Sequence, residues 1–465
     1  MTDSSRFAPS RRHFLGLAAA GAGALAFPHI WVPRPVHAQT AMNGAVKHLI
    51  YIRLSGGFRF PTAFNANVAG QFNPFGTAGG VPDGVAWGVS KLLESAPYLE
   101  DEALVDSGMR SASRLADKIT VMPTVDHEPL AAGADGNHET GLERYLTGFV
   151  NGEAGFFTRI QMGLAKRYQT ALDEGKLLLP PFVMGSSGMA RGLGVYAPHR
   201  PPVLNGASFD RFTSSGAEAP EWSQSLVRAV DVRMRDRQHP ELRDRVDAYL
   251  QTRDATKAYS EIFASEQLKI ENDSEEAFDG ISNRELRTFF GDSSESRNVR
   301  LALRLFHYGC PAVYLDQGGY DYHSGEQDAL PGAMENVNRL ISALCHVLPR
   351  LKHPDGGSYW DHTVVAFGSE FSRTAGGGGG FNSARGSDHG GDYATRWMSM
   401  PFFGGPVRGG RIVGASTAQA DLAPDGTIYS YRSVLNTLMD GLGCEPGSPA
   451  YYAGDVLVPD LLGGA

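Results

Sequence analysis

The chain has 465 residues, enough for one large α/β domain or for two domains, and its 42% hydrophobic content can supply an ordinary core. Its formal net charge is −9 at pH 7. Nucleic acids and anionic membranes are bound through basic surfaces, so this charge argues against both as partners. The 3 cysteines are far apart in the sequence and allow at most one disulfide, and we expect mainly buried thiols.

The first 38 residues indicate a targeting segment rather than part of the fold. Residues 10–15 (SRRHFL) form a twin-arginine export motif, an apolar run follows at 16–27, and residues 36–38 (VHA) offer a small-residue cleavage site. We expect a mature chain from about Gln39 that is periplasmic or secreted, with the twin-arginine export machinery as a partner. An uncleaved anchor is the alternative, but the apolar run is shorter than the roughly 20 residues of a membrane span. No stable span is therefore expected after cleavage.

Apolar runs and helical patterns alternate along the rest of the chain. The spacing first predicts strands over residues 46–54, 118–123 and 177–185, and helices over 139–149 and 155–168. Residues 220–305 are rich in charge, with apolar residues at helical spacing, and predict a helical insertion or the helical flank of a sheet. Beyond them, strands are predicted over 312–316, 362–369 and 400–404, and helices over 333–351 and 431–442.

This alternation of strand and helix predicts an α/β fold with a mainly parallel sheet flanked by helices. We expect residues 39–465 to form a single domain. Ligands bind such sheets at the carboxyl ends of the strands, so the polar residues that follow the predicted strands are the candidates for a functional site.

Metal-ligating residue types follow successive predicted strands. Asp321 and His323 can face one ion, because residues two apart in extended chain point the same way. Glu370 directly ends the next apolar strand, and Asp388 and His389 lie between glycines. Such side chains bind Zn²⁺, Mn²⁺, Ca²⁺ or Mg²⁺, so we expect one divalent metal ion. The alternative is ordinary loop closure, in which Asp388 caps a turn and His389 packs beneath it.

The predicted helix that begins near residue 139 carries a second set of candidates. An imidazole or a hydroxyl at a helix N-terminus meets free N–H groups and the positive end of the helix dipole, which favour a phosphate or a sulfate group. His138 and Thr140 are therefore candidate catalytic residues, as is Thr124 after the second strand. Asn137 suits a helix N-cap.

Taken in order, these motifs resemble the DUF1501 family, twin-arginine-exported bacterial proteins of unknown function that look like distant members of the alkaline phosphatase and sulfatase superfamily. The resemblance spans residues 46–443. It rests on LSGG at 54–57, NHET at 137–140, LTG at 146–148, GYDYH at 319–323, SEFSRT at 369–374, GSDHG at 386–390 and GGPVRGGR at 404–411. It implies an alkaline-phosphatase-like sheet and, as substrate, a phosphate or sulfate ester of a small molecule or a polymer.

The resemblance also bears on the number of metals. Members of that superfamily bridge the ester with two metals and use an aspartate after the first strand. Here no Asp or Glu lies between Lys47 and Asp83, and Arg59 stands in the corresponding loop. One metal is therefore easier to build than two, with Asp321, His323 and His389 as ligands and Glu370 as a ligand or a supporting group.

Two alignments with the superfamily stay open. Either Asp388 and His389 are its Asp-His pair, or Ser369 and Glu370 take that position and His389 is its separate late histidine. We favour the second, because Glu370 directly ends an apolar strand. Arg373 or Arg59 would hold the oxyanion of the ester. The competing hypothesis is a non-catalytic cell-envelope protein that keeps the fold with a degenerate metal site.

Overall fold

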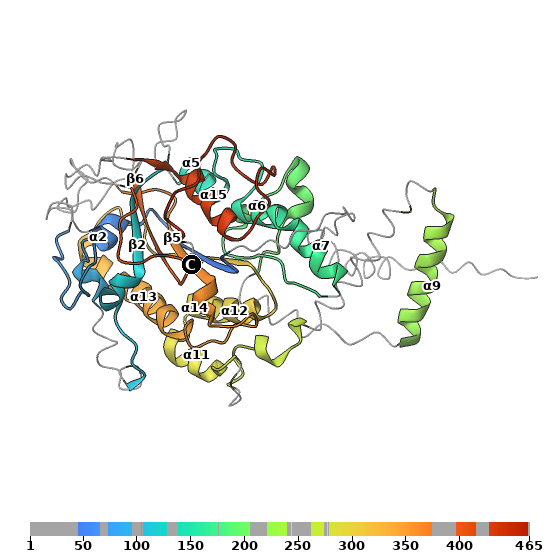
Figure 1. The fold of residues 1–465 in the computed structure, drawn as a ribbon, viewed down its shortest axis with the longest axis horizontal. Helices are drawn as coiled ribbons and strands as arrows, with labels where there is room; N and C mark the ends of the chain where they lie inside the picture. Colours follow the sequence, from blue (N-terminus) through green and yellow to red (C-terminus); the bar gives the residue numbers. More distant parts are fainter. Residues whose placement is uncertain are drawn as a thin grey trace, which may run out of the picture.

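The structure is a computed structural model centred on a seven-stranded sheet with helices on both sides (Figure 1). It describes residues 45–65, 73–94, 104, 106–127, 138–174, 176–204, 221–239, 243, 262–273, 277, 279–373, 397–414 and 427–463. The expected leader at 1–38 lies outside these residues, as do Asp388 and His389.

The sheet has the strand order β3-β4-β1-β5-β6-β2-β7. Its strands are β1 (His48–Leu54), β2 (Ile119–Asp126), β3 (Phe182–Met184), β4 (Ala312–Gln317), β5 (Thr363–Gly368), β6 (Trp397–Phe403) and β7 (Tyr429–Ser430). Only β6 runs against its neighbours, pairing antiparallel with both β5 and β2. The other six strands share one direction, so their carboxyl ends meet at one edge. This confirms the mainly parallel sheet that the sequence predicts.

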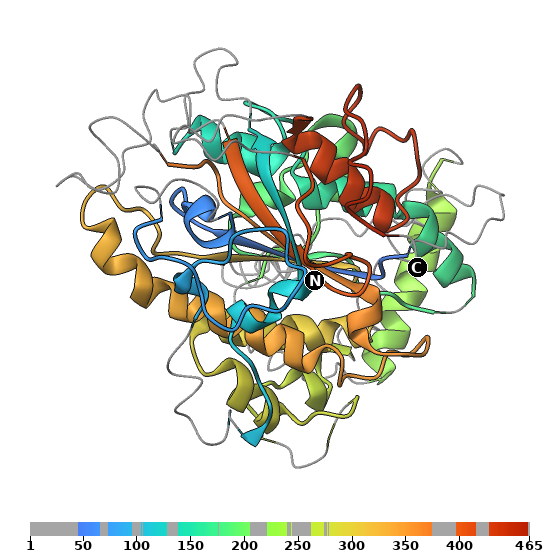
Figure 2. The same cartoon turned by 60° about the vertical axis from the view of Figure 1, so that its left-hand side comes forward.

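Helices cover both faces of this sheet (Figure 2). One face carries α2 (Phe60–Phe64), α11 (Asn283–Phe290), α12 (Ser294–His307), α13 (Glu326–Val347) and α14 (Tyr359–His362). The other carries α5 (Thr140–Thr147), α6 (Phe156–Gly163), α7 (Ala165–Asp173) and α15 (Tyr431–Gly441). Short 3₁₀ helices, η1 (Lys91–Leu93) to η5 (Glu266–Leu268), join these elements.

Strand β1 shows why both faces are covered. Its seven residues are all buried, and successive side chains enter different cores. Ile50 and Ile52 enter the core that includes α12 and α13, whereas Leu49 and Tyr51 enter the core that includes α5, α6 and α15. A strand has period-two geometry, so one that is buried at every position must be covered on both faces, as is typical of parallel sheets.

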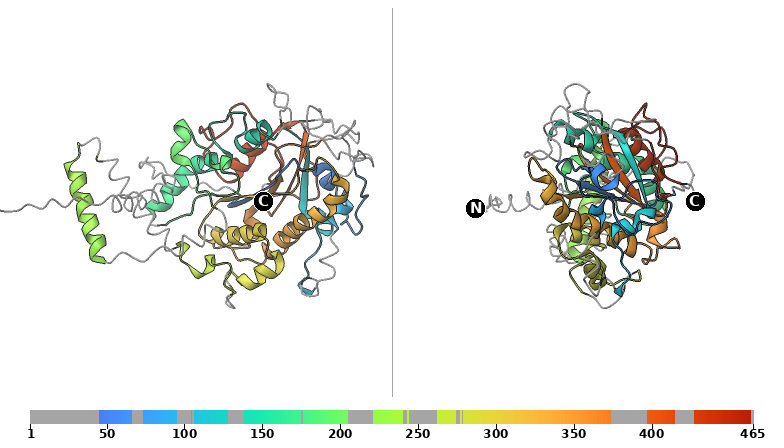
Figure 3. Two further views of the ribbon diagram at one scale, coloured as in Figure 1. Left: turned by 180° about the vertical axis from the view of Figure 1, so that it is seen from behind. Right: turned by 90° about the vertical axis from the view of Figure 1, so that its left-hand side faces the viewer.

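The helical region at 220–305 contains two different parts. Helix α12 packs against β4, and α11 packs against α12 and α13, so both belong to the flank of the sheet. Their N-termini are held by Ser282 and Ser293, whose hydroxyls accept from backbone N–H groups of the first turn. Helix α9 (Glu221–Arg237) stands apart from the sheet and its covering helices (Figures 1 and 3). Its Leu226 and Met234 are exposed.

Two further expectations can be compared with the described residues. Cys310, Cys345 and Cys444 are buried free thiols, which confirms the expected buried cysteines. None of the helices within the described ranges combines the length and the apolar character needed to cross a membrane.

Candidate metal centre

The polar residues of the predicted site gather at the carboxyl edge of the sheet. Asp321 and His323 follow β4, and Glu370 and Arg373 follow β5. His138 comes just before α5, which follows β2 in the sequence. Because β6 is antiparallel, it begins at this same edge, where Trp397 pairs with Asp126.

His138, Asp321 and His323 form a cluster able to hold a metal ion. Each offers one ligand atom, and the three atoms lie within 4.8 Å of one another. The Nε2 atoms of His138 and His323 are 3.3 Å and 3.1 Å from Oδ1 of Asp321. The side chain of His138 is 41% exposed, that of Asp321 47% and that of His323 56%, so a substrate could reach an ion held between them.

Glu370 lies behind this cluster and supports it. Its side chain is 3% exposed, and its Oε1 accepts from the backbone N–H of Gly56 at 2.7 Å and lies 3.8 Å from Nδ1 of His138. Burial opposes its ionisation, but contacts with His138, Arg53 and the Gly56 amide outweigh burial and lower the pKa of Glu370 to about 2. The same contact with Glu370 raises the pKa of His138, so this position favours positive charge. A carboxylate behind a ligating histidine is the usual supporting arrangement in metal sites.

Arg373 is fully buried and holds the two loops of the site together. Its Nε donates to the carbonyl of Gly57 at 2.9 Å, its Nη1 to that of Tyr322 at 2.8 Å, and its Nη2 to that of Gly56. Nη2 also contacts Oδ1 of Asp321 at 2.5 Å. Burial opposes the ionisation of Asp321, but Arg373 and the two histidines together lower its pKa. In this arrangement the guanidinium orients Asp321.

The turn after β1 depends on glycine. Gly56 has φ +114°, and a Cβ there would lie 2.4 Å from the backbone nitrogen of Asp321. The loops after β1 and β4 therefore approach so closely that a side chain at position 56 would displace Asp321. The close approach of the LSGG turn therefore sets the position of the loop that carries Asp321.

Arg53 belongs to the candidate site, although no motif in the sequence indicates it. It lies in β1, 5% exposed, with its Nε 3.2 Å from Glu370 and its Nη1 3.6 Å from Asp316. Asp316 in turn accepts from the hydroxyl and the backbone N–H of Ser186 at 2.6 Å. The signal that could have revealed it is an arginine inside an otherwise apolar strand, where a buried charge needs a partner.

The remaining candidates are placed as follows. Thr140 is partly buried at the first residue of α5, and Thr124 is buried within β2. Arg59 is buried and paired with Glu326, with contacts of 3.3 Å and 3.2 Å. Ser369 accepts from the backbone N–H groups of Gly57 and Phe58, so it shapes the turn after β1.

Strand-end carboxylates and histidines on a mainly parallel sheet define an α/β protein with a candidate metal centre. The sequence model of the DUF1501 family, described as "Protein of unknown function (DUF1501)", matches residues 85–458. The chain therefore belongs to the DUF1501 family. A search of curated proteins finds no match to it.

Solved structures with a similar arrangement resemble the chain only weakly. They include Ps i-CgsB in complex with k-i-k-neocarrahexaose, with 9% identity, 85% of this chain and 72% of that chain covered, and a TM-score of 0.33. The integral membrane protein lipooligosaccharide phosphoethanolamine transferase A from Neisseria meningitidis has 12% identity, 98% and 66% coverage, and a TM-score of 0.31. A variant of the TAB5 alkaline phosphatase with bound Mg has 10% identity, 85% and 98% coverage, and a TM-score of 0.28. Similarity at this level carries no conclusion about activity.

Proposed function

We propose that the chain is an exported hydrolase of phosphate or sulfate esters that uses one divalent metal at the carboxyl edge of the sheet. The observation that carries this proposal is the convergence of His138, Asp321 and His323 within 4.8 Å. Three protein ligands that leave a coordination position open are typical of catalytic rather than structural zinc. Two imidazoles also favour Zn²⁺ over Ca²⁺, Mg²⁺ or Mn²⁺, for which oxygen ligands are better suited.

When bound, such an ion supplies Lewis-acid polarisation of the phosphoryl or sulfuryl oxygen of the ester. The residues of the chain hold the geometry that this requires. Glu370 orients His138, and Arg373 orients Asp321, so each acts as a positioning residue. In hydrolysis the water oxygen bonds to phosphorus or sulfur, and the ester oxygen leaves with its electron pair and takes up a proton. Thr140, at the start of α5, is the proposed hydroxyl contact to the ester.

We further propose His389 as an additional ligand, with Asp388 beside it. Both lie outside the described residues. The support for this proposal comes from the described residues that flank them in the sequence. Arg373 and Trp397 both lie at the carboxyl edge of the sheet. Twin-arginine export to the periplasm is proposed from the SRRHFL motif alone.

A non-catalytic envelope protein with a structural metal is the second candidate. It is favoured by the loop after β1, which has no carboxylate in residues 55–65. Arg59 of this loop is buried and paired with Glu326. The described residues therefore support one metal rather than the bridged pair of the superfamily.

The test measures metal content and turnover on purified mature protein. Zinc and manganese binding would be titrated for wild type, His138→Ala, Asp321→Asn and His323→Ala, with His239→Ala as a control outside the cluster. Each cluster variant should weaken metal binding by more than the roughly 10- to 100-fold that follows loss of a supporting partner. A panel of phosphatase and sulfatase substrates would follow.

Three outcomes are distinguishable. Metal-dependent turnover that the cluster variants abolish supports the hydrolase. A metal bound at the cluster without turnover favours the envelope protein. The proposed metal centre is overturned if the protein binds neither zinc nor manganese. It is also overturned if wild type, the three cluster variants and the control all bind metal equally well.

A further inference from the structure

A cavity of about 360 Å³ lies at the opposite edge of the sheet from the candidate metal centre. It is formed between η2 (Ala112–Lys118), which leads into β2, and the last turns of α13. Since η2 precedes β2 and the candidate site follows it, the two locations are separated by the length of that strand. Helix α13 begins beside the buried Arg59–Glu326 pair and ends at this cavity.

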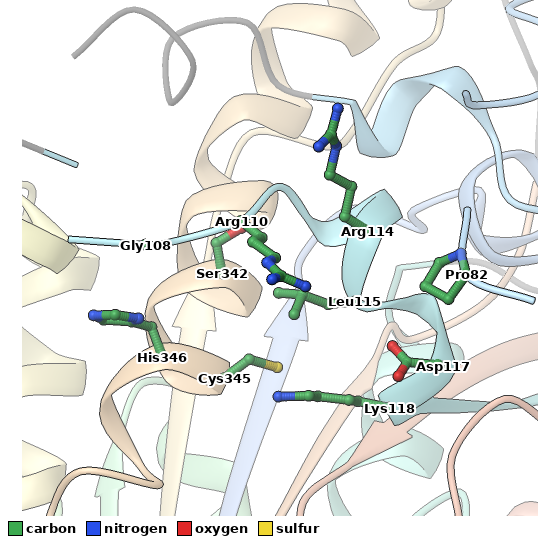
Figure 4. Close-up of a pocket in the computed structure, with 10 residues that line it drawn as sticks. All are labelled: Pro82, Gly108, Arg110, Arg114, Leu115, Asp117, Lys118, Ser342, Cys345 and His346. Atoms are coloured by element: carbon green, nitrogen blue, oxygen red, sulfur yellow. The ribbon is translucent and has the colours of Figure 1, made fainter. Parts of the chain in front are cut away.

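The charged side chains around the cavity are mostly basic. Arg110, Arg114 and Lys118 contribute three cations, and Asp117 contributes the single carboxylate. None of the three cations has an ion-pair partner within the described ranges. Figure 4 shows Lys118 reaching toward Cys345, with Arg110 above it, whereas the side chain of Arg114 points away from both.

The floor of the cavity adds polar groups on α13. Ser342 is fully buried, and its hydroxyl has no hydrogen-bond partner among the described residues. His346 lies beside it and accepts through Nε2 from Nη1 of Arg350 at 3.0 Å, so its Nδ1 carries the proton and can donate. A buried polar group without a partner carries a desolvation penalty that a bound ligand could relieve.

We propose that this cavity binds an oxyanion of the phosphate or sulfate class, either as the free ion or as the end group of a small molecule. Arg110 and Lys118 would supply the charge-assisted hydrogen bonds, and Ser342 and His346 would supply neutral donors. Lys118 is already oriented, because its Nζ lies 5.2 Å from the centre of the Trp360 ring. The site is independent of the metal centre and requires no metal.

Calorimetric titration of inorganic phosphate, inorganic sulfate and glycerol 3-phosphate would test this proposal. The mature protein would first be treated with EDTA, so that no anion is held through a metal. The Arg110→Ala/Lys118→Ala double variant removes the two proposed donors. Lys91→Ala/Lys352→Ala is the matched control, because both lysines are exposed and have no ion pair within the described ranges. Asp117→Asn removes the opposing carboxylate.

Wild type should bind with millimolar or tighter affinity, and the double variant should bind at least about tenfold more weakly. The control should match wild type, and Asp117→Asn should bind more tightly. Tight binding of both free ions would identify the free oxyanion as the ligand, whereas preference for glycerol 3-phosphate would identify a monoester. No saturable binding, or equal weakening in the double variant and the control, would overturn the proposal. His138→Ala should bind these anions like wild type, which separates this site from the metal centre.

Discussion

Replacing Glu370 with glutamine tests the central carboxylate of the site. The Glu370 carboxylate is buried, accepts from Gly56 at 2.7 Å and lies 3.2 Å from the buried Arg53 guanidinium. Glutamine keeps the shape but loses the charge, and it presents one oxygen where two are used. Removing one partner of a buried ion pair costs about 3–5 kcal/mol. Because Arg53 keeps Asp316 at 3.6 Å, we expect the lower end, about 3 kcal/mol of unfolding free energy.

The same change should weaken metal binding, because His138 loses its supporting carboxylate. The expected loss is about 10- to 100-fold. Urea denaturation of EDTA-treated protein measures the effect on stability, and titration with Zn²⁺ or Mn²⁺ measures the effect on the metal. Glu153→Gln is the matched control, since Glu153 is exposed and makes no ion pair within the described ranges. If Glu370→Gln destabilises no more than this control, the assigned role of Glu370 is refuted.

Three further predictions concern other parts of the molecule. Gly56→Ala should abolish metal binding, because its Cβ would meet the backbone of Asp321. Gly76→Ala is the control: Gly76 also has a positive φ but is surrounded by open space, so this variant should still bind metal. Titration with metal measures both. Glu326→Gln should lose up to about 3–5 kcal/mol in urea denaturation by leaving Arg59 buried without its carboxylate, yet the metal centre should persist. Burial, followed by repulsion from His362, lowers the pKa of His353 to about 4, and burial also lowers the pKa of His48, to which His353 is hydrogen-bonded. Because the pKa of His353 is lower in the folded than in the unfolded protein, neutral His353 contributes stability that is complete above pH 6.5 and is lost as the pH falls toward 4. The free energy of unfolding of His353→Gln should therefore fall less between pH 7 and 5 than that of wild type. Equal losses would contradict the assignment.

Much of the fold could be predicted because its strands are nearly continuous apolar runs. The strand expected at 46–54 is β1, the one at 362–369 is β5, and the helix expected at 431–442 is α15. Such runs are long, fully buried and bounded by turn residues, so local pattern alone identifies them. The direction of β6 was not predictable, because a short apolar run has the same pattern in parallel and antiparallel pairing.

The candidate site was predictable only in part. Asp321, His323 and Glu370 could be selected as candidates from the sequence because they follow apolar strands. His138 was expected to act catalytically at a helix N-terminus. The structure places its Nε2 3.3 Å from Oδ1 of Asp321, so the segment before α5 meets the loop after β4, which is far from it in the sequence. Arg373 was expected to hold a substrate, and its burial against Gly56, Gly57 and Tyr322 appears only in three dimensions.

The sequence by itself determined the residue types available and the strand ends at which they stand, because hydrophobic periodicity and turn residues are local properties. Tertiary structure alone decided which strand ends are neighbours. Strand order places β4, β1 and β5 side by side, so Asp321, the Gly56 turn and Glu370 meet, although Gly56 lies 314 positions before Glu370 in the sequence. The same packing decided which charges are partnered. Arg59 is paired with Glu326 and Arg373 with Asp321, while Arg110 and Lys118, at the far edge of the sheet, make no ion pair among the described residues.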